Sequence, residues 1–298
     1  MPPLCLSRVR TPRPRDGRAV VRRVMKKIGI VVKSDHPQRD EVIKNLVGWL
    51  HQKKKEVLII DPRKRPRALT VGMVIVLGGD GTLLSIARLI EGRDIPILAV
   101  NLGSLGFLTE VTFDELYANL ERVLQNQFLE DPRQMLQCAI RRGPRLLRQP
   151  TVLNEVVVAS GPLAKLIRME ISIDQVFVTS LRASGVIVST ATGSTAYSLS
   201  AGGPIVYPSV EALVLTPISP HMLTHRPLVV PARAKIEVAP KTQEKGLVVT
   251  LDGQQATPLA PDDVVQIQTA EKRLKLIRSP HRNYYQVLRQ KLHWGEGP

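Results

Sequence analysis

Short apolar runs alternate with amphipathic stretches over the first part of the chain, residues 25–130. The apolar runs cover residues 28–32, 57–60, 73–77 and 97–100, a length typical of buried strands. Between residues 113 and 124 the apolar side chains instead recur every three or four positions, which predicts a helix. Strands that alternate with helices indicate an α/β domain with a mostly parallel sheet and helices on both of its faces.

The pattern changes after about residue 131, where short strands rich in Val and Ile follow one another, with turns of Gly, Pro, Asp and Asn between them. This succession predicts a second, all-β domain over residues 131–280. We expect a C-terminal segment, 281–298, with a helix at 284–292 that returns to the first domain. The predicted strands of the second domain are 156–159, 166–173, 176–179, 186–189, 228–230, 236–239, 248–251, 264–268 and 274–277.

The first 24 residues differ from both domains, because they are rich in Pro and Arg and show no periodicity. They carry seven arginines against one aspartate, a large share of the formal net charge of +16. We expect residues 1–24 to be a disordered basic tail, or the natural start to be Met25, directly before the first predicted strand. A chain shortened to begin at Met25 should then keep its activity and its Tm.

Composition restricts the class of protein further. Apolar residues make up 43% of the chain, as in an ordinary globular protein, and no apolar run reaches the roughly 18 residues that span a membrane. The two cysteines, Cys5 and Cys138, cannot build a disulfide framework or a zinc site, which favours the reducing cytoplasm. The basic body suits a small polyanionic ligand or nucleic acid. Because no nucleic-acid-binding motif is visible, we expect no nucleic-acid partner, and no membrane partner either.

A glycine-rich turn follows the predicted strand 73–77 and precedes a predicted helix at 83–90. It consists of Gly78, Gly79, Asp80, Gly81 and Thr82. Free backbone N–H groups and the positive end of a helix dipole make such a turn an anion site. Asp80 would repel a phosphate unless it takes a proton from an attacking hydroxyl or holds Mg²⁺. Alternatively, Asp80 is only the N-cap of the helix in a tight turn.

A second glycine-rich turn, residues 101–107, follows the next predicted strand. Two such turns after adjacent strands lie at the carboxyl edge of the sheet, where open α/β sheets bind ligands. The chain contains no P-loop pattern, and the first turn lacks the third glycine of G-x-G-x-x-G. Phe107 either belongs to the core or lays its ring against a ligand.

A third feature is the Ser/Thr block, residues 189–204, which follows the predicted strand 186–189. Its many hydroxyl groups suit a surface that wraps a polar ligand, and a polar turn that caps a helix is the alternative. Asn154 and Glu155 lie inside an otherwise apolar strand, where adjacent polar groups are costly without partners. A ribose with vicinal hydroxyls is a natural partner for them, and the neighbouring backbone is the alternative.

Together these segments resemble the NAD kinase family of bacterial type, from residue 28 to about residue 277. The matching segments, in order, are LGGDGTLL, VNLGSLGFLTE, LNEVVV, STATGSTAYSLSAGGPIV and TPISPHMLTHRPLVVP. Lipid kinases share GGDGT, whereas the Ser/Thr block together with the Asn-Glu pair is far more specific.

The resemblance implies a Rossmann-like N-terminal domain, a β-sandwich C-terminal domain and a homo-oligomer, a dimer or a tetramer. It implies transfer of the γ-phosphoryl group of ATP or polyphosphate, with a divalent metal such as Mg²⁺, to the 2′-hydroxyl of the adenosine ribose of NAD. Asp80 matches the general base of the family. The other positions that the resemblance places at the NAD and ATP site are Gly78, Gly79, Gly81, Phe107, Asn154, Glu155, Lys165, Arg182, Ser184, Thr192, Thr195, Ala196, Tyr197, Ser198, Leu199, Ser200 and Gln254.

The chain departs from the family pattern at three points. Ser184 stands where the family usually has Asp, Ala191 where it has Pro, and Asp174-Gln175 where a hairpin has Asp-Gly. The lost carboxylate at Ser184 concerns the nicotinamide side of the site, and the other two are tolerable backbone changes.

Two other functions fit parts of the sequence. One is a lipid kinase of the diacylglycerol type, and the other is a non-catalytic dinucleotide-binding regulator in which Ser184 marks a decayed site.

Overall fold

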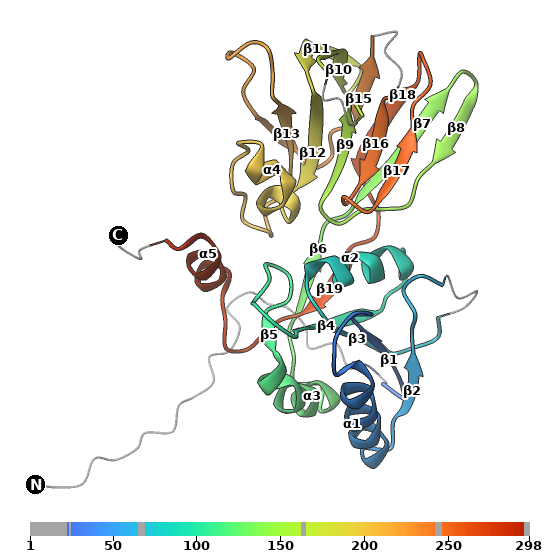
Figure 1. Ribbon diagram of the computed structural model, residues 1–298, viewed down its shortest axis with the longest axis vertical. Helices are drawn as coiled ribbons and strands as arrows, with labels where there is room; N and C mark the ends of the chain where they lie inside the picture. The colour runs from blue at the N-terminus through green and yellow to red at the C-terminus, as the bar shows by residue number, and fades with distance from the viewer. Residues whose placement is uncertain (1–22, 24, 65–68, 162–164, 242–245, 295–298) are drawn as a thin grey trace, which may run out of the picture.

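A parallel sheet forms the first of two domains in the computed structural model, which describes residues 23, 25–64, 69–161, 165–241 and 246–294 (Figure 1). The sheet has the order β2-β1-β3-β4-β19-β6, and β5 pairs with β4. β2, β1, β3 and β4 are parallel, as the alternating pattern predicts. The bounds of the strands from the first part of the chain are β1 Lys27–Val32, β2 Glu56–Ile59, β3 Met73–Leu77, β4 Pro96–Asn101 and β5 Val111–Thr112.

Helices cover both faces of this sheet, because successive side chains of its buried strands point to opposite sides. α1 and α3 pack on one face, where Leu46 and Leu120 share a hydrophobic cluster with Ile30. α2 packs on the other face, where Leu83 joins Val76, and it lies between the sheet and the second domain (Figure 1). The helix bounds are α1 Arg39–Gln52, α2 Asp80–Leu89 and α3 Leu116–Leu124, the last preceded by the 3-10 turn η1 Phe113–Glu115.

Two strands complete the first sheet after long excursions of the chain. β19 (Leu274–Ile277) pairs in parallel with β4 and antiparallel with β6 (Glu130–Arg133). The sequence analysis placed residues 274–277 among the strands of the all-β domain, and the structure corrects this assignment. The apolar pattern of these residues identifies an extended segment, but only the path of the chain between the domains decides which sheet it joins.

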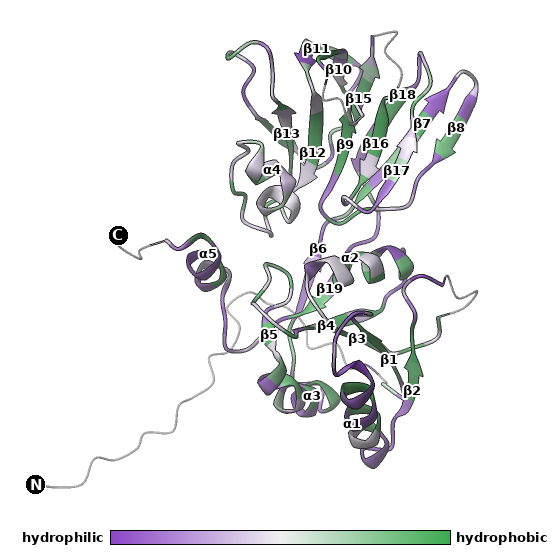
Figure 2. Cartoon of the chain, in the orientation of Figure 1, coloured by the Kyte–Doolittle hydropathy of each residue, from purple (hydrophilic) through white to green (hydrophobic). Residues whose placement is uncertain are grey.

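The second domain is an antiparallel β-sandwich, as predicted. One sheet has the order β11-β10-β15-β18-β7-β8 and the other β14-β13-β12-β9-β16-β17. Val156 and Val188 of the second sheet meet Met169 and Val238 of the first in one buried cluster, and Figure 2 shows these strands as largely hydrophobic. The bounds are β7 Leu136–Arg142, β8 Arg145–Arg148, β9 Glu155–Ala159, β10 Ile167–Ile173, β11 Val176–Ala183, β12 Gly185–Thr190, β13 Ala212–Ile218, β14 Leu228–Pro231, β15 Ile236–Pro240, β16 Val248–Leu251, β17 Gln255–Pro258 and β18 Val264–Thr269.

Besides the helices of the first domain, the described residues include three more helical segments. The Ser/Thr block contains the 3-10 turn η2 (Gly193–Thr195) and α4 (Tyr197–Ser200). The predicted C-terminal helix is confirmed as α5 (Tyr284–Leu292), and the Asn283 side chain caps it by accepting a hydrogen bond from the backbone N–H of Gln286. Because the Gln286 side chain in turn accepts a hydrogen bond from the backbone N–H of Asn283, the start of α5 is well defined.

Arg23 belongs structurally to the first domain, although the sequence analysis counted it in the tail. Its guanidinium donates to Glu130 Oε1 at 2.5 Å and to Asp94 Oδ1 at 2.9 Å, and its backbone N–H donates to Asn126 Oδ1 at 2.8 Å. The hydrogen bond from Arg23, together with Lys275, lowers the pKa of Asp94 to about 2. The prediction for residues 1–22 and 24 lies outside the described residues.

Removal of Arg23 should therefore lower stability, contrary to the expectation from the sequence. We expect a chain that begins at Met25 to lose roughly 2–6 °C of Tm, because it loses partly buried, charge-assisted hydrogen bonds. Thermal unfolding of this chain and of one that begins at Arg22 measures the effect. Equal Tm values for the two would show that the Arg23 contacts do not contribute.

Candidate functional site

A cavity opens at the carboxyl edge of the parallel sheet, beside the first glycine-rich turn. Its volume is about 780 Å³, and basic side chains contribute to its wall together with both glycine-rich turns. The positive charge of Lys33 and Arg63 suits a phosphate chain. The lining residues are Val32, Lys33, Ser34, Asp35, His36, Pro62, Arg63, Gly78, Gly79, Gly81, Thr82, Ser85, Asn101, Leu102, Gly103 and Ser104.

Asp80 is the first residue of α2, but it does not cap that helix. The N-cap is Gly79, and the Asp80 carboxylate turns toward the second glycine-rich turn. Oδ2 accepts a hydrogen bond from the backbone N–H of Phe107 at 2.9 Å. Oδ1 accepts from the N–H groups of Leu108 and Thr109 at 3.1 and 3.2 Å, and from the Thr109 hydroxyl. The alternative that Asp80 is a helix cap is therefore wrong.

These hydrogen bonds leave Asp80 Oδ2 with spare acceptor capacity. An ionised carboxylate oxygen has about two lone-pair sites, and within the described part of the chain Oδ2 uses one of them. Gly106 makes the contact possible, because a Cβ at that position would lie 2.1 Å from Asp80 Oδ1. The half-buried Phe107 holds the Asp80 carboxylate through its backbone N–H, a contact that does not involve its ring.

Glu155 is the first residue of β9 and Asn154 directly precedes it, where the sandwich faces α2, so the expectation that both lie inside a strand is wrong. Both are buried, with 8% and 5% of their surfaces exposed. The backbone N–H groups of both donate to Asp252 Oδ1, at 2.8 and 3.1 Å. Among the residues that the structure describes, Glu155 Oε2 finds no hydrogen-bond partner. The neighbouring structure therefore satisfies the backbone of the pair and leaves one carboxylate oxygen available.

Burial raises the pKa of Glu155 to about 8, and the charge of the nearby Asp252 adds to the effect. Burial also raises the pKa of Asp252, although three backbone N–H groups, one of them from Leu153, oppose that shift. Two carboxyl groups in one desolvated place resist simultaneous ionisation. Without a ligand, Glu155 is thus protonated at neutral pH, and a donor that reaches Oε2 would favour its ionised form.

The Ser/Thr block packs directly against the Asn154-Glu155 pair. A Cβ on Gly193 would lie 2.2 Å from the backbone oxygen of Asn154, so glycine allows this close approach. The Thr190 backbone N–H donates to that same oxygen at 2.9 Å. The structure therefore brings together two motifs that are separated by more than thirty residues in the sequence.

The hydroxyl groups of the block divide into two kinds. Ser194 and Ser198 are fully buried, and their hydroxyls bind Ala191 O and Thr216 Oγ1, so they hold the block together. Tyr197 and Ser200 are exposed, so their hydroxyls are open to a ligand, and their place at the nucleotide site stays a prediction. The remaining predicted positions, Thr192, Thr195, Ala196 and Leu199, belong to the same two helical turns, and the first of them is buried.

Gln254 joins the two halves of the site. It lies in the turn between β16 and β17, and its Nε2 donates to the Gly81 backbone oxygen at 2.8 Å. Its Oε1 accepts from Ser85 at 3.1 Å and from Arg88, both on α2. The hairpin that holds Asn154 and Glu155 through Asp252 is thus bonded to the first turns of the helix that begins with Asp80.

Three predicted site residues lie elsewhere in the sandwich. Ser184 separates β11 from β12, Arg182 is on β11, and Lys165 precedes β10. The Ser/Thr block follows the opposite end of β12, and six strand residues span about 20 Å. Within one copy of the chain, Ser184 is therefore far from the block and from Asn154.

Several residues of this site escaped the sequence analysis. Lys33 and Arg63 line the cavity because they follow strands of the parallel sheet, a rule that could have found them. Asp252 has a positive φ of 49° in its hairpin, which marks a tight turn. Its sequence, Asp-Gly after a strand, indicates a hairpin but not the contact with residues 153–155.

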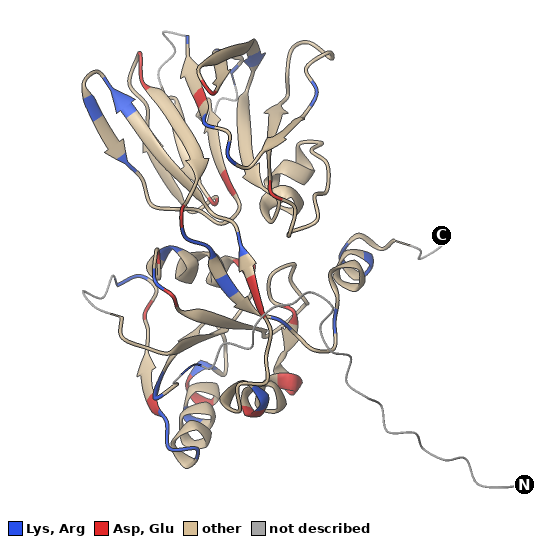
Figure 3. Cartoon of the chain, turned by 180° about the vertical axis from the view of Figure 1, so that it is seen from behind, with Lys and Arg blue, Asp and Glu red and all other residues tan. Residues whose placement is uncertain are grey.

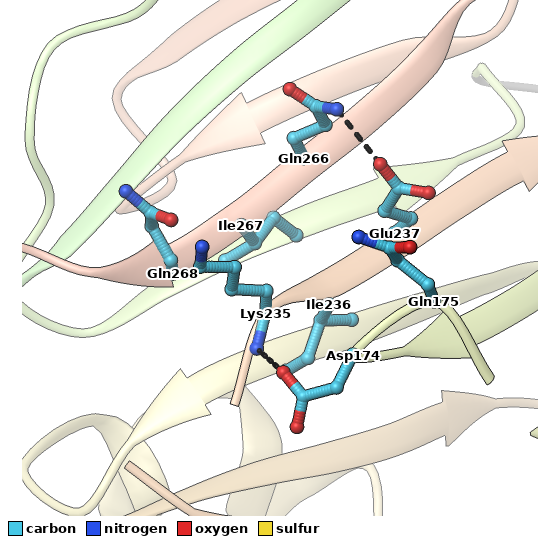
Figure 4. Close-up of a pocket in the computed structure, with 8 residues that line it drawn as sticks. All are labelled: Asp174, Gln175, Lys235, Ile236, Glu237, Gln266, Ile267 and Gln268. Atoms are coloured by element: carbon cyan, nitrogen blue, oxygen red, sulfur yellow. Dashed lines mark hydrogen bonds between the residues drawn. The ribbon is translucent and has the colours of Figure 1, made fainter. Parts of the chain in front are cut away.

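A second hollow lies on the outer face of the sandwich, apart from all predicted site residues. Its volume is about 430 Å³, and it has mixed charge, with Lys235 beside Asp174 and Glu237 bonded to Gln266 (Figure 4). Lys and Arg are scattered over both domains, with acidic residues between them (Figure 3). In the described residues no three His, Cys, Asp or Glu side chains gather as a metal site, and no helix is long and apolar enough to cross a membrane.

Comparisons with known proteins match both domains of the chain. Residues 64–128 match the model of the ATP-NAD kinase N-terminal domain, and residues 153–279 match that of the ATP-NAD kinase C-terminal domain. The chain is 46% identical to the NAD kinase of Syntrophotalea carbinolica, over 91% of this chain and 100% of that protein. It is 44% identical to the NAD kinase of Geobacter sulfurreducens, again over 91% of this chain and 100% of that protein.

Solved structures agree as well. Yeast NADH kinase in complex with NADH superposes with a TM-score of 0.82 at 25% identity, over 92% of this chain and 89% of that one. An NAD kinase from Archaeoglobus fulgidus in complex with ATP superposes with a TM-score of 0.73 at 26% identity, over 90% and 98%.

The fold, the glycine-rich turns and these matches define a two-domain nucleotide-binding phosphotransferase. Within that class, the chain belongs to the NAD kinase family. The resemblance seen in the sequence is thereby confirmed. The comparisons give no support to a lipid kinase or to a non-catalytic regulator.

Proposed function

We propose that this chain transfers the γ-phosphoryl group of ATP to the 2′-hydroxyl of the adenosine ribose of NAD, which gives NADP and ADP. Polyphosphate, which presents the same terminal phosphoryl group, is the alternative donor. The observation that carries the proposal is the position of Asp80. Asp80 lies in the turn beside a basic cavity suited to phosphates. Its neighbour Gly81 is bonded to Gln254, which belongs to the hairpin that holds the buried pair Asn154-Glu155.

In the proposed mechanism NAD lies between the two domains, with its adenosine ribose at Asp80. Asp80 Oδ2, the oxygen with spare acceptor capacity, takes the proton of the 2′-hydroxyl as that oxygen attacks the γ-phosphorus. The bond from the γ-phosphorus to the bridging oxygen breaks, and ADP leaves. Lys33 and Arg63 hold the phosphates and neutralise their charge, and His36 lies beside them in the cavity wall. Positioning and charge stabilisation are most of what phosphoryl transfer asks of a protein.

The residues present also fit a divalent cation. Mg²⁺ keeps several waters and usually binds through one or two carboxylates together with substrate phosphates, so it needs no cluster of protein ligands. Asp35 lines the proposed phosphate site, and Asp80 lies between Gly79 and Gly81, which also line it, so these two carboxylates could share the cation with the phosphates. A bound Mg²⁺ would neutralise charge on the transferred group.

We also propose a cytoplasmic location, which the buried, unpaired Cys138 supports.

One assay tests the proposed activity. The protein is incubated with ATP, Mg²⁺ and NAD, and the formation of NADP is followed with an NADP-specific dehydrogenase. We expect NADP to form only with all three present, and EDTA to stop the reaction. No NADP with either ATP or polyphosphate would refute the proposal.

Glu155 should make the affinity for NAD depend on pH. Its pKa of about 8 means that below pH 7 it is neutral and resembles glutamine, whereas above pH 8.5 it is a carboxylate. A carboxylate accepts from ribose hydroxyls about twice as strongly as a neutral group. The KM for NAD of Glu155→Gln should therefore exceed that of the wild type only slightly at pH 6.5 and by about tenfold at pH 9. Steady-state kinetics at several pH values measure this ratio.

Thermal unfolding supplies the control for that experiment. The pKa of Glu155 is raised above its ordinary value of 4.5, so the folded state binds a proton that the unfolded state has released. The corresponding stability is present below pH 4.5 and is lost as the pH rises toward 8. Glu155→Gln should remove this slope. A KM ratio that does not change with pH would contradict the ribose contact.

We further propose that the chain forms a homo-oligomer through the edge strand β11. Val176, Phe177 and Val178 are consecutive and expose 68, 60 and 41% of their surfaces. Unpaired apolar edges favour pairing with another chain. A second copy at this edge would also account for Ser184 and Lys165, which lie too far from the Asn154-Glu155 pair to share its site within one chain.

Substitution at the edge tests this assembly. Phe177→Glu should reduce the molar mass measured by light scattering from that of a dimer or tetramer to a smaller species, because a charge cannot be buried unpaired. Leu146→Glu is the matched control, since Leu146 is 51% exposed on β8 at the opposite edge of the same sheet. A monomeric wild type, or the same loss in both variants, would contradict the proposal.

A further inference from the structure

The C-terminal segment touches the loop that holds Asp80. Arg282 Nη1 donates to the backbone oxygen of Glu110 at 2.9 Å and forms an ion pair with Glu115 Oε2 at 2.6 Å. Both side chains of the ion pair are only 24% exposed. Glu110 directly follows Thr109, whose N–H and hydroxyl bind Asp80 Oδ1. Arg282 therefore bonds to the residue next to the turn that positions Asp80.

Two residues later, the same segment touches the Ser/Thr block. The ring of Tyr284, which is 6% exposed, meets the ring of Tyr207 edge to face, with centroids 5.0 Å apart and an interplanar angle of 78°. Tyr207 follows Val206, whose backbone N–H donates to Ser194 Oγ at 2.9 Å. Ser194 Oγ in turn donates to Ala191 O at 2.7 Å. Tyr284 is thus connected, through two contacts, to the turn beside Asn154.

Residues 282–284 form a short and well-defined connection between these two places. Asn283, the residue between the two contacts, is the N-cap of α5 and exchanges hydrogen bonds with Gln286. The capping box limits the freedom of the backbone at this point. The segment can therefore transmit a displacement from one contact to the other.

We propose that residues 282–284 are a positioning bridge, which sets the placement of the Asp80 turn relative to the Ser/Thr block. The inference rests on the proposed function, because it takes Asp80 and the block to be two sides of one active site. The strands β6 and β19 already connect the domains, so the bridge adjusts their relative position and does not hold them together. In phosphoryl transfer, a misplacement of about 1 Å costs up to about 10²-fold in rate.

Arg282→Gln and Tyr284→Leu each release one end of the bridge. We expect kcat for NADP formation to fall about tenfold in each variant, while Kd for NAD, measured by calorimetry, stays within about threefold. Tyr284→Phe keeps the ring contact and removes a buried hydroxyl that has no hydrogen-bond partner in the described residues, so it should retain kcat. Arg289→Gln, an equal loss of charge at an exposed position on α5, is the matched control and should also retain kcat.

Hydrogen exchange of the full chain gives a readout that does not depend on activity. Each variant should raise the rate of backbone amide exchange at the far end of the bridge, in the segment that the substituted residue does not contact. For Arg282→Gln this is the Ser/Thr block and Val206, and for Tyr284→Leu it is residues 107–110. Exchange that changes only in α5 and at the released contact would overturn the bridge, as would a kcat within twofold of the wild type in both variants. A wild type that forms no NADP would refute the proposed function instead, and exchange would still decide the bridge.

Discussion

Asp80→Asn should lower the turnover of NADP formation by about 10²-fold or more, because general-base help to an unactivated hydroxyl is worth about 10²–10⁴-fold. NAD binding should stay within about tenfold, a change of at most about 1.4 kcal/mol. Asparagine replaces one accepting oxygen by an NH₂ group, so a backbone N–H of the 107–109 turn also loses its acceptor. We therefore expect a lower Tm as well. Activity is measured at low temperature, where the variant is still folded.

A control variant separates the two roles that Asp80 could have, as a proton acceptor and as the carboxylate that holds the 107–109 turn. Thr109→Val removes the hydroxyl that donates to Asp80 Oδ1 and accepts from Asn101 Nδ2, and it leaves the carboxylate intact. Its turnover should fall less than about tenfold, since the net contribution of one hydrogen bond is about 1 kcal/mol. Equal losses in Thr109→Val and Asp80→Asn would mean that Asp80 holds the turn and takes no proton.

Gly106→Ala should affect turnover nearly as strongly as Asp80→Asn. The new Cβ would lie 2.1 Å from Asp80 Oδ1 and 2.4 Å from Thr109 Oγ1, so the carboxylate and the turn must move apart. A displacement of the base by about 1 Å costs up to about 10²-fold in rate. NAD binding should change little, because Asn154 and Glu155 are on the other domain. Steady-state kinetics and calorimetry measure the two quantities.

Gly103→Ala is the comparison within the same turn. The nearest atom to a Cβ at Gly103 is Asn101 Oδ1, at 3.9 Å, which is an ordinary contact. The same substitution there should cause a much smaller loss. If both variants lose turnover equally, the effect comes from the general rigidity of the turn and not from the contact with Asp80.

Local patterns in the sequence were sufficient for most elements of the fold. The apolar runs at β1, β3 and β4 are fully or almost fully buried, as expected for central strands of a parallel sheet. β19 shows the limit of this reasoning. Its residues are as apolar as those of the sandwich strands, and its neighbours β4 and β6 are distant in sequence. Strand propensity describes one segment, whereas pairing depends on the whole path of the chain.

The candidate site likewise has features that the sequence predicts and contacts that it does not. From the sequence we predicted Asp80, the glycine-rich turns, the Asn154-Glu155 pair and the Ser/Thr block as site residues, because glycines, hydroxyls and buried polar residues in such numbers are unusual within strands and turns. It could not reveal that the Asp80 carboxylate binds the 107–109 turn or that Asp252 holds the pair, because these contacts join residues about 28 and 98 positions apart.

By itself the sequence determined the fold class, the family and the chemical groups available at the site, since each follows from residue type and short spacing. The tertiary structure alone decided the relations between those groups. It turned Asp80 away from its own helix, raised the pKa of Glu155 to about 8 by burial beside Asp252, and joined residues 282–284 to Glu110 and to Tyr207. Burial and contact depend on neighbours that only the folded chain supplies, so they could not be read from any single segment.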